Sequence, residues 1–321
     1  MKELKNKYVR SVIKLGNSYA MTFPQEWTNQ ANLKEKSEVT LYPIDDRSII
    51  IRTFDKEKKT IFNIDGNEWP VKLIKQAIIS AFKLNVDEIY IKYNDDNQED
   101  IYKLIINLER ETIGFDFKDN SERKEFFINF LLDTSSKPFQ DILMDLSEVF
   151  RRIIKNVIEG ITKKNSELLL AEIERKYSLG TRILITGLSD YPVSEGYRNI
   201  PLIRFLGDRV MLLYIRDFIN EALTLKLISN DIIKKFSEIL IKIPSLLINL
   251  IKNYDNINLD SISNFQGYLS KLGMMLENFA YEESNIEVQQ VRNKIKYYLN
   301  SFQNFFDIGI TRLIESEIGM V

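Results

Sequence analysis

The sequence predicts a multidomain α+β protein in which a β-rich N-terminal segment precedes a small α/β domain and a long all-α region. Short runs of β-branched and aromatic residues, separated by turn residues, fill the first 54 positions. Strand and helix patterns then alternate to about residue 133, and apolar residues at helical spacing occupy the remainder. Because 321 residues exceed one ordinary domain, we expect domains at 1–54, 55–133 and 136–321.

The N-terminal segment is predicted to contain a hairpin, a short helix and two further strands. Gly16-Asn17-Ser18 marks the hairpin turn, because Gly and Asn tolerate left-handed backbone, and Pro24 fits a helix start. Four short strands cannot bury a core alone, and a chain without cysteine cannot add a disulfide. We therefore expect a second chain to complete this domain. The strands are expected at Tyr8–Leu15, Tyr19–Phe23, Val39–Tyr42 and Ile49–Thr53.

The second segment, 55–133, has the pattern of one small sheet covered by two helices. Its strand and helix patterns follow the order βαβαββ. The expected elements are Lys59–Ile64, Glu68–Leu84, Glu88–Tyr93, Gln98–Leu108, Ile113–Phe117 and Lys124–Leu132.

The third segment, 136–321, is helix-patterned throughout and is expected to contain six helices. Because the first and fourth begin after comparable breaks, a duplicated three-helix bundle is the expected arrangement. An aromatic stripe on the last helix is expected to be core. The helices are expected at Pro138–Lys163, Ser166–Leu188, Pro201–Leu227, Asn230–Tyr254, Ser261–Ala280 and Asn285–Ile318.

The composition excludes several classes of function. With no cysteine and no histidine, the chain cannot form a zinc–thiolate site or a Ser-His-Asp or Cys-His catalytic site. We therefore expect neither an enzyme nor a cofactor. Ile239–Ile251, the most apolar helical run, contains a lysine and a proline, and no signal peptide is apparent. We expect a soluble cytoplasmic protein without membrane insertion.

Positive charge is concentrated at the N-terminus although the net charge of the chain is -2. Five cations stand against Glu3 alone in residues 1–14, and a two-fold dimer would double this charge. Lys and Arg contact phosphates, and Asn and Ser also bond phosphates or base edges. The alternative is an ordinary charged strand with a basic tail. The candidate DNA-binding residues are Lys5, Lys7, Arg10, Lys14, Asn17 and Ser18.

The same stretch resembles a known class of DNA-binding domain. Ile13–Ala20, IKLGNSYA, followed by Phe23–Trp27, FPQEW, resembles the AbrB/SpoVT and MazE class, as do Leu33-Lys34 and Glu38-Val39. The resemblance covers residues 7–53. It implies a swapped-hairpin β-barrel made by two chains, and double-stranded DNA as partner. Lys36-Ser37 replaces the usual Gly-Asp turn, and some members of the class use the barrel for partner recognition.

The helical segment resembles the PhoU family of phosphate-uptake regulators. Glu172–Leu179, EIERKYSL, is similar to the E-V-D-R-x-Y stretch of archaeal PhoU relatives. Arg209-Val210 with Ile215–Ala222 is similar to their R-V…I-x-D-x-x-x-N-I-A stretch. The order of an AbrB-like domain, a small α/β domain and a helical bundle also matches. The resemblance implies a six-helix PhoU-like domain and a role in phosphate homeostasis.

The carboxylate pairs that hold metal in PhoU proteins are interrupted here. Glu174 and Asp217 match the second carboxylate of each motif, but Leu170 and Leu213 stand four residues earlier. A spacing of four puts both carboxylates on one helix face, within reach of one ion, and this pair is broken at both places. We therefore expect no metal at this site, and an ion pair as the role of each carboxylate.

These patterns together predict a dimeric DNA-binding transcriptional regulator. The helical domain would be its sensor, dimerisation element or docking platform for a protein partner. One alternative is a signalling adaptor that acts by protein–protein contacts without binding DNA. A third interpretation, a metal-binding storage or hydrolytic bundle, has the least support, because histidine is absent and the carboxylate pairs are interrupted.

Overall fold

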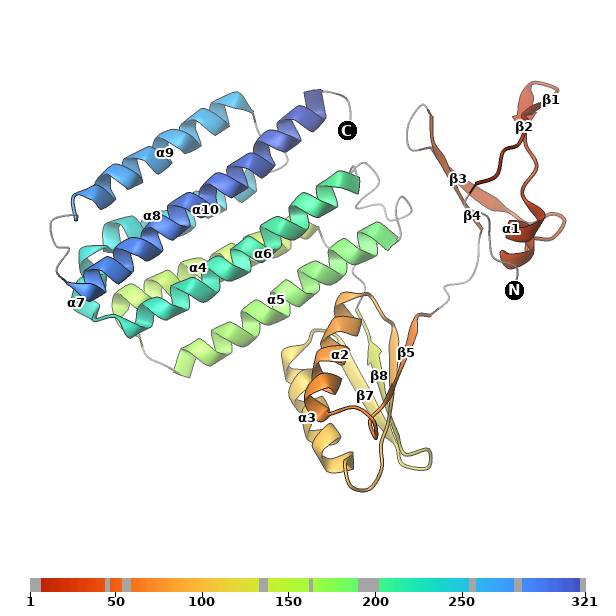
Figure 1. Cartoon of the computed structure of the whole chain (residues 1–321), viewed down its shortest axis with the longest axis horizontal. Helices are drawn as coiled ribbons and strands as arrows, with labels where there is room; N and C mark the ends of the chain where they lie inside the picture. The colour runs from red at the N-terminus through yellow and green to blue at the C-terminus, as the bar shows by residue number, and fades with distance from the viewer. Residues whose placement is uncertain are drawn as a thin grey trace. The chain divides into compact units, whose positions relative to one another are not determined.

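The computed structural model describes residues 7–43, 47–53, 59–132, 138–161, 164–189, 202–253, 258–279 and 285–317. The chain divides into two compact units, residues 1–58 and residues 59–321 (Figure 1). The first unit contains the N-terminal strands, and the second combines an α/β part with the C-terminal helices. This confirms the predicted multidomain α+β class with N-terminal strands and a C-terminal helical region.

The N-terminal unit contains two separate antiparallel strand pairs and one short helix. Gly16 adopts a left-handed φ of 60° in the first hairpin, as its turn position requires. The first two strands are shorter than the predicted Tyr8–Leu15 and Tyr19–Phe23, because the described residues of one chain pair only their inner ends. One chain does not form a closed barrel from its described residues. The elements are β1 (Ile13–Leu15), β2 (Ser18–Ala20), α1 (Gln25–Gln30), β3 (Val39–Pro43) and β4 (Ile49–Thr53).

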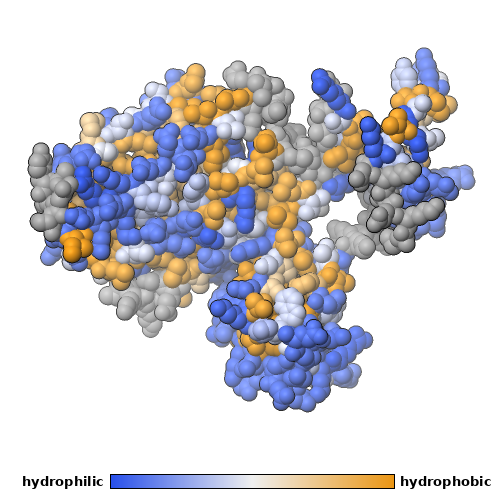
Figure 2. All heavy atoms as spheres, viewed as in Figure 1, coloured by the Kyte–Doolittle hydropathy of each residue, from blue (hydrophilic) through white to orange (hydrophobic). Residues whose placement is uncertain are grey.

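The described part of this unit has no core of its own. None of its residues from 7–43 and 47–53 is buried. Large apolar side chains are instead exposed on both strand pairs and on the segments directly before β1 and after β2, and Figure 2 shows orange, hydrophobic spheres on the surface of this unit. The exposed side chains are Val9, Val12, Ile13, Leu15, Tyr19, Met21, Leu41 and Ile49.

The turn before β3 carries Lys36-Ser37 where the resembled class has Gly-Asp. Lys36 adopts a φ of 67°, the left-handed region that glycine enters most easily. The Ser37 amide donates to the Lys34 carbonyl at 3.0 Å, and the Ser37 hydroxyl accepts from the Lys34 amide at 2.9 Å. These bonds hold a tight turn despite the side chain at position 36.

The α/β part has one four-stranded sheet in the order β5-β6-β8-β7, with two helices on one face (Figure 1). Strands β5 and β6 are parallel, and the other neighbouring pairs are antiparallel. The element order is the predicted βαβαββ. The elements are β5 (Ile61–Asp65), α2 (Val71–Lys83), β6 (Glu88–Lys92), α3 (Gln98–Glu111), β7 (Phe115–Asn120) and β8 (Glu125–Phe130).

Gly66, directly after β5, lies too close to a neighbouring backbone for any side chain. Its amide donates to the Lys92 carbonyl at 2.9 Å, and a Cβ here would lie 2.4 Å from that same oxygen. We expect Gly66→Ala to lower the free energy of unfolding by about 1–3 kcal/mol through overpacking. Urea denaturation followed by circular dichroism measures this. An unchanged midpoint would contradict the close approach.

The helical part follows the six predicted segments, with one division. The fourth segment is two helices that meet at Phe236, rather than one. A short 3₁₀ turn, Leu225–Leu227, ends the third segment. The helices are α4 (Phe139–Glu159), α5 (Lys164–Ser189), α6 (Leu202–Thr224), α7 (Asn230–Lys235), α8 (Ser237–Lys252), α9 (Leu259–Glu277) and α10 (Ile286–Glu317).

These helices share one continuous core, which differs from the predicted pair of three-helix bundles. The reason is the central position of α4, which buries ten of its 21 residues and packs against α5, α6 and α8. Tyr298, Phe302, Phe305 and Phe306 of α10 belong to this core, as predicted, whereas Tyr297 is exposed. The Phe218 ring of α6 lies 5.2 Å from that of Tyr298 and 5.3 Å from those of Phe302 and Phe305.

Arg182 of α5 joins the helical part to the α/β part. Its Nη1 donates to the carbonyls of Phe82 at 2.9 Å and Val86 at 3.2 Å, where α2 ends. Its guanidinium also lies over the rings of Phe82 and Phe130, at 5.0 and 5.4 Å. Only 2% of its surface is exposed, and this burial lowers its pKa, with Asp87 opposing the shift. The carbonyl oxygens at the C-terminal end of α2 compensate for part of the cost of burying this charge.

Helix α9 is the least embedded of the long helices whose burial is fully described. It buries three of its nineteen residues, and a Cβ at Gly267 or Gly273 would meet nothing within 4 Å. Glycine inside a helix costs about 1 kcal/mol relative to alanine. We therefore expect Gly267→Ala to raise the free energy of unfolding by about 0.5–1 kcal/mol, measured by urea denaturation. Any destabilisation would indicate that this face of α9 is covered.

None of the helices in the described ranges is long and apolar enough to span a membrane.

Candidate nucleic-acid interface

The β1–β2 hairpin presents two different faces. Lys14 pairs with Tyr19 across the hairpin, and Ile13 and Leu15 pair with Ala20 and Ser18. Because side chains alternate along a strand, Lys14 and Tyr19 share one face and the other four share the opposite face. The hairpin therefore has one apolar face and one face that carries a cation beside an aromatic ring.

The structure places the described candidate residues on an open surface. Lys7, Arg10, Lys14, Asn17 and Ser18 are all exposed, and Lys5 lies outside the described residues. The Arg10 guanidinium donates to the Val9 carbonyl at 3.1 Å and lies 5.8 Å from the centre of the Tyr8 ring. Asn17 is in the two-residue turn at the tip of the hairpin.

The structure does not bring all of these residues to one face. Lys14 and Ser18 point to opposite faces of the hairpin, because Ser18 shares the face of Leu15. The charged side chains between residues 7 and 25 are nevertheless all positive. No carboxylate occurs between Lys7 and Gln25, and the first one after Lys7 is Glu26. A positive potential is therefore unopposed along this stretch of the chain.

Of the two predicted carboxylates of the helical part, Asp217 forms an ion pair, and Glu174 forms none among the described residues. Asp217 accepts from its neighbour Arg216 at 3.1 Å. Arg216, Arg209 and Lys83 lie over the ring of buried Tyr177, at 4.3, 5.3 and 5.1 Å from its centre.

Burial lowers the pKa of the Lys83 ammonium, with Arg209 and Arg216 adding to that shift and Glu174 opposing it. Among the residues that the structure describes, no three His, Cys, Asp or Glu side chains form a group that could hold a metal ion. The carboxylates found here therefore balance cations that surround one aromatic ring.

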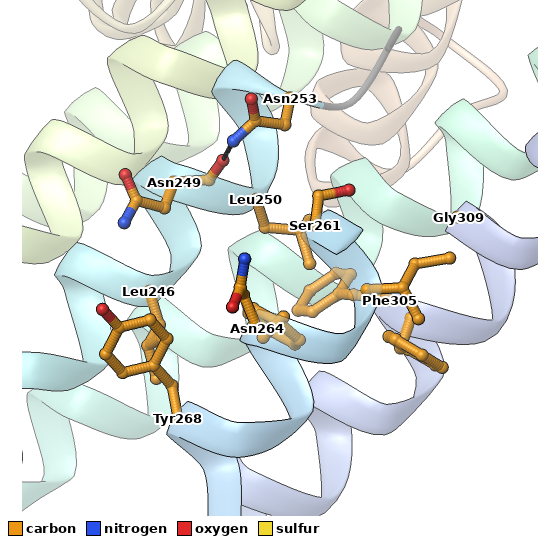
Figure 3. Close-up of a pocket in the computed structure, with 12 residues that line it drawn as sticks. Leu246, Asn249, Leu250, Asn253, Ser261, Asn264, Tyr268, Phe305 and Gly309 are labelled. Carbon is orange, nitrogen blue, oxygen red and sulfur yellow. Dashed lines mark hydrogen bonds between the residues drawn. The ribbon is translucent and has the colours of Figure 1, made fainter. Parts of the chain in front are cut away.

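A cavity between α8, α9 and α10 is the feature that sequence reasoning missed (Figure 3). It has a volume of about 250 Å³, and its floor includes Leu246, Phe265, Phe305 and Phe306. Its rim carries uncharged polar groups, and Asn264 points from α9 toward α8 (Figure 3). The sequence carries no signal for this cavity, because it depends on how the three helices pack. The rim residues are Asn249, Asn253, Ser261, Asn264 and Tyr268.

The N-terminal geometry defines a small β unit with an exposed basic hairpin and with apolar side chains that its own described residues do not cover. Residues 12–59 match the family described as "Antidote-toxin recognition MazE, bacterial antitoxin". This part of the chain is therefore a MazE/AbrB-type domain, which confirms the N-terminal resemblance. No curated protein and no solved structure matches the chain. The resemblance of the helical part to PhoU stays a prediction.

Proposed function

We propose that this protein is a dimeric transcriptional regulator that binds duplex DNA through its MazE/AbrB-type domain. The observation that carries the proposal is the exposed charge of Lys7, Arg10 and Lys14 on the N-terminal unit, where Lys14 lies inside the matched residues 12–59 and the other two directly precede them. Cations of this kind supply most of the sequence-independent affinity for DNA. Asn17 and Ser18 at the hairpin tip add groups that bond phosphates or base edges.

The dimer is supported by the missing core of the N-terminal unit. Its described residues bury no side chain, while Val12, Ile13, Leu15 and Leu41 are each more than half exposed. Covering such surface contributes about 25 cal/mol per Å². A swapped-hairpin barrel, in which two chains interleave their strands, would cover the apolar hairpin face. It would also give Tyr8–Val12 a strand partner.

The helical part is proposed as the sensor or docking element of the regulator. Its PhoU resemblance supports phosphate homeostasis as the regulated process. Coupling to DNA affinity requires an event on the helices that changes how two N-terminal domains are presented. No enzymatic step is proposed for any part of the chain.

A second candidate is an adaptor that acts through protein contacts and does not bind DNA. The matched family is described by antidote–toxin recognition, and its description does not mention DNA. The exposed apolar side chains of the N-terminal unit would then contact a partner protein.

Fluorescence anisotropy of a labelled duplex, titrated with the full-length protein across a salt series, tests the proposal. We expect binding whose logarithm falls steeply and linearly with the logarithm of salt concentration. Analytical ultracentrifugation of the same sample establishes whether it is a dimer. A folded dimer that does not bind duplex DNA at low salt would overturn DNA binding and leave the adaptor.

A further inference from the structure

The cavity at α8, α9 and α10 continues into a second, larger one along α8 and α9. The first has a volume of about 250 Å³ and the second about 640 Å³. Leu246, Asn249 and Tyr268 line both, so together they form one groove. Small-molecule sites in proteins have volumes of about 300–1,000 Å³ and mostly apolar linings. The groove has the size and the lining of a ligand site.

The two ends of the groove differ in chemistry. The α10 end has a floor of Phe305 and Phe306, and none of its described lining residues is charged. The other end is lined by Leu272 and Met275, and its charged lining residues among those described are Lys242 and Lys271. No carboxylate is among the described lining residues, and the nearest one recorded is that of Glu238, which bonds Lys242. An apolar body at one end and an anionic group at the other would complement this surface.

Both lysines are available to an anion. The Lys242 ammonium bonds Glu238 at 2.8 Å, but Glu238 is 74% exposed, and such surface pairs contribute little. Lys271 contacts the Tyr268 ring at 5.7 Å, and no ion pair is present for it among the described residues.

The dimensions of the groove favour a long ligand. Lys242 and Asn253 are eleven residues apart along α8, which corresponds to about 16 Å at the helical rise. An extended medium-chain acyl group is of comparable length. A phosphate would need more donors than two lysines, because backbone amides inside α8 and α9 are used by the helices themselves.

We propose that this groove binds an amphipathic carboxylate with a medium-length acyl chain. The chain lies on the apolar floor toward Phe305 and Phe306, and the carboxylate lies between Lys242 and Lys271. Since α9 is held by three buried residues, the ligand adds the apolar contacts that this helix lacks. The ligand therefore orders α9 against α8 and α10.

Isothermal titration calorimetry of the full-length protein with sodium decanoate tests the proposal, with decyltrimethylammonium and adenosine monophosphate as comparison ligands. We expect one decanoate per groove and binding of the cationic amphiphile at least about tenfold weaker. Equal binding of the two amphiphiles would show detergent-like adsorption and overturn the site. Tighter binding of the nucleotide would overturn the ligand class.

Two pairs of variants locate the binding. Asn264→Trp fills the cavity mouth and should weaken decanoate binding at least about tenfold, whereas Gln266→Trp, on an exposed position of α9 outside the lining, should not. Lys271→Gln should weaken binding at least about threefold, whereas Lys252→Gln should not. If the two variants of each pair bind decanoate equally well, the groove is not the binding site.

Hydrogen exchange of the wild-type protein tests the site without any variant. Decanoate should slow exchange in Leu259–Glu277 and leave α2 and α3 unchanged. Unchanged exchange in α9 at saturating decanoate would overturn the proposal. Because these experiments contain no DNA, their outcome is independent of the proposed DNA-binding function.

Discussion

Replacing Arg10 and Lys14 together with alanine should remove most of the affinity of the protein for duplex DNA. Both side chains are exposed, and no carboxylate lies near them in the sequence. A dimer would lose four cations, so the slope of log affinity against log salt should fall by up to about 3–4. Fluorescence anisotropy across a salt series measures both quantities, and circular dichroism establishes that the variant is folded.

The matched control changes the same charge on the other unit of the chain. Lys72 and Lys118 are exposed in the α/β part, and Lys72→Ala/Lys118→Ala removes two cations from each chain. We expect this variant to keep nearly all of its affinity. If both double variants lose affinity equally, DNA would respond to overall charge, and the hairpin would have no special role.

Replacing Arg182 with methionine should produce the largest loss of stability among the substitutions considered for the second unit. The change removes the Arg182 donor from the Phe82 and Val86 carbonyls, of which Phe82 keeps the Asn85 amide at 3.2 Å, and removes the cation from two aromatic rings. Hydrogen bonds to charged groups contribute about 1.5–3 kcal/mol each. Relief of the buried charge offsets part of this, and Nε has no partner among the described residues. We expect a net loss of about 2–3 kcal/mol.

Urea denaturation at one protein concentration measures this loss, with two comparison variants. Arg175→Met, on the same helix but only partly buried, should change the free energy of unfolding by less than about 0.5 kcal/mol. Arg182→Lys should restore part of the stability, because one ammonium bonds fewer carbonyls than the fork of a guanidinium. Equal midpoints for Arg182→Met and the wild type would show that Arg182 does not hold the two parts together.

Local patterns in the sequence predict most of the secondary structure. The strand and helix order of the α/β part follows from residue spacing alone, because each element buries one face against the same sheet. Ile74, Ile78 and Phe82 of α2 are all fully buried at the spacing that indicates a helix. The six C-terminal segments also follow from residue spacing, because each buries an apolar face in the shared helical core.

Contacts between distant segments are what the sequence does not predict. Arg182 looks like an ordinary surface arginine in its helix, yet residues 177–184 are all buried because α5 packs against α2 as well as α4 and α6. The division at Phe236 and the single core also depend on which helices meet α4. The groove depends on how far α9 lies from α8, which no residue type specifies.

For the candidate DNA-binding residues, too, the sequence predicts local properties but not how the residues are arranged in space. Their exposure was predictable from residue type, and the turn at Gly16 follows from its backbone freedom. The separation of Lys14 from Ser18 was not predictable, because it depends on the strand register of a two-residue turn. A shift of one position would exchange the two faces.

The absence of buried side chains in the described N-terminal unit links its folding to the law of mass action. If a second copy supplies the missing core, the free energy that folds this unit depends on the concentration of the protein. Dilution would then unfold the N-terminal unit while residues 59–321, which bury their own core, stay folded. The cellular amount of the protein would itself set the fraction of chains that can occupy DNA.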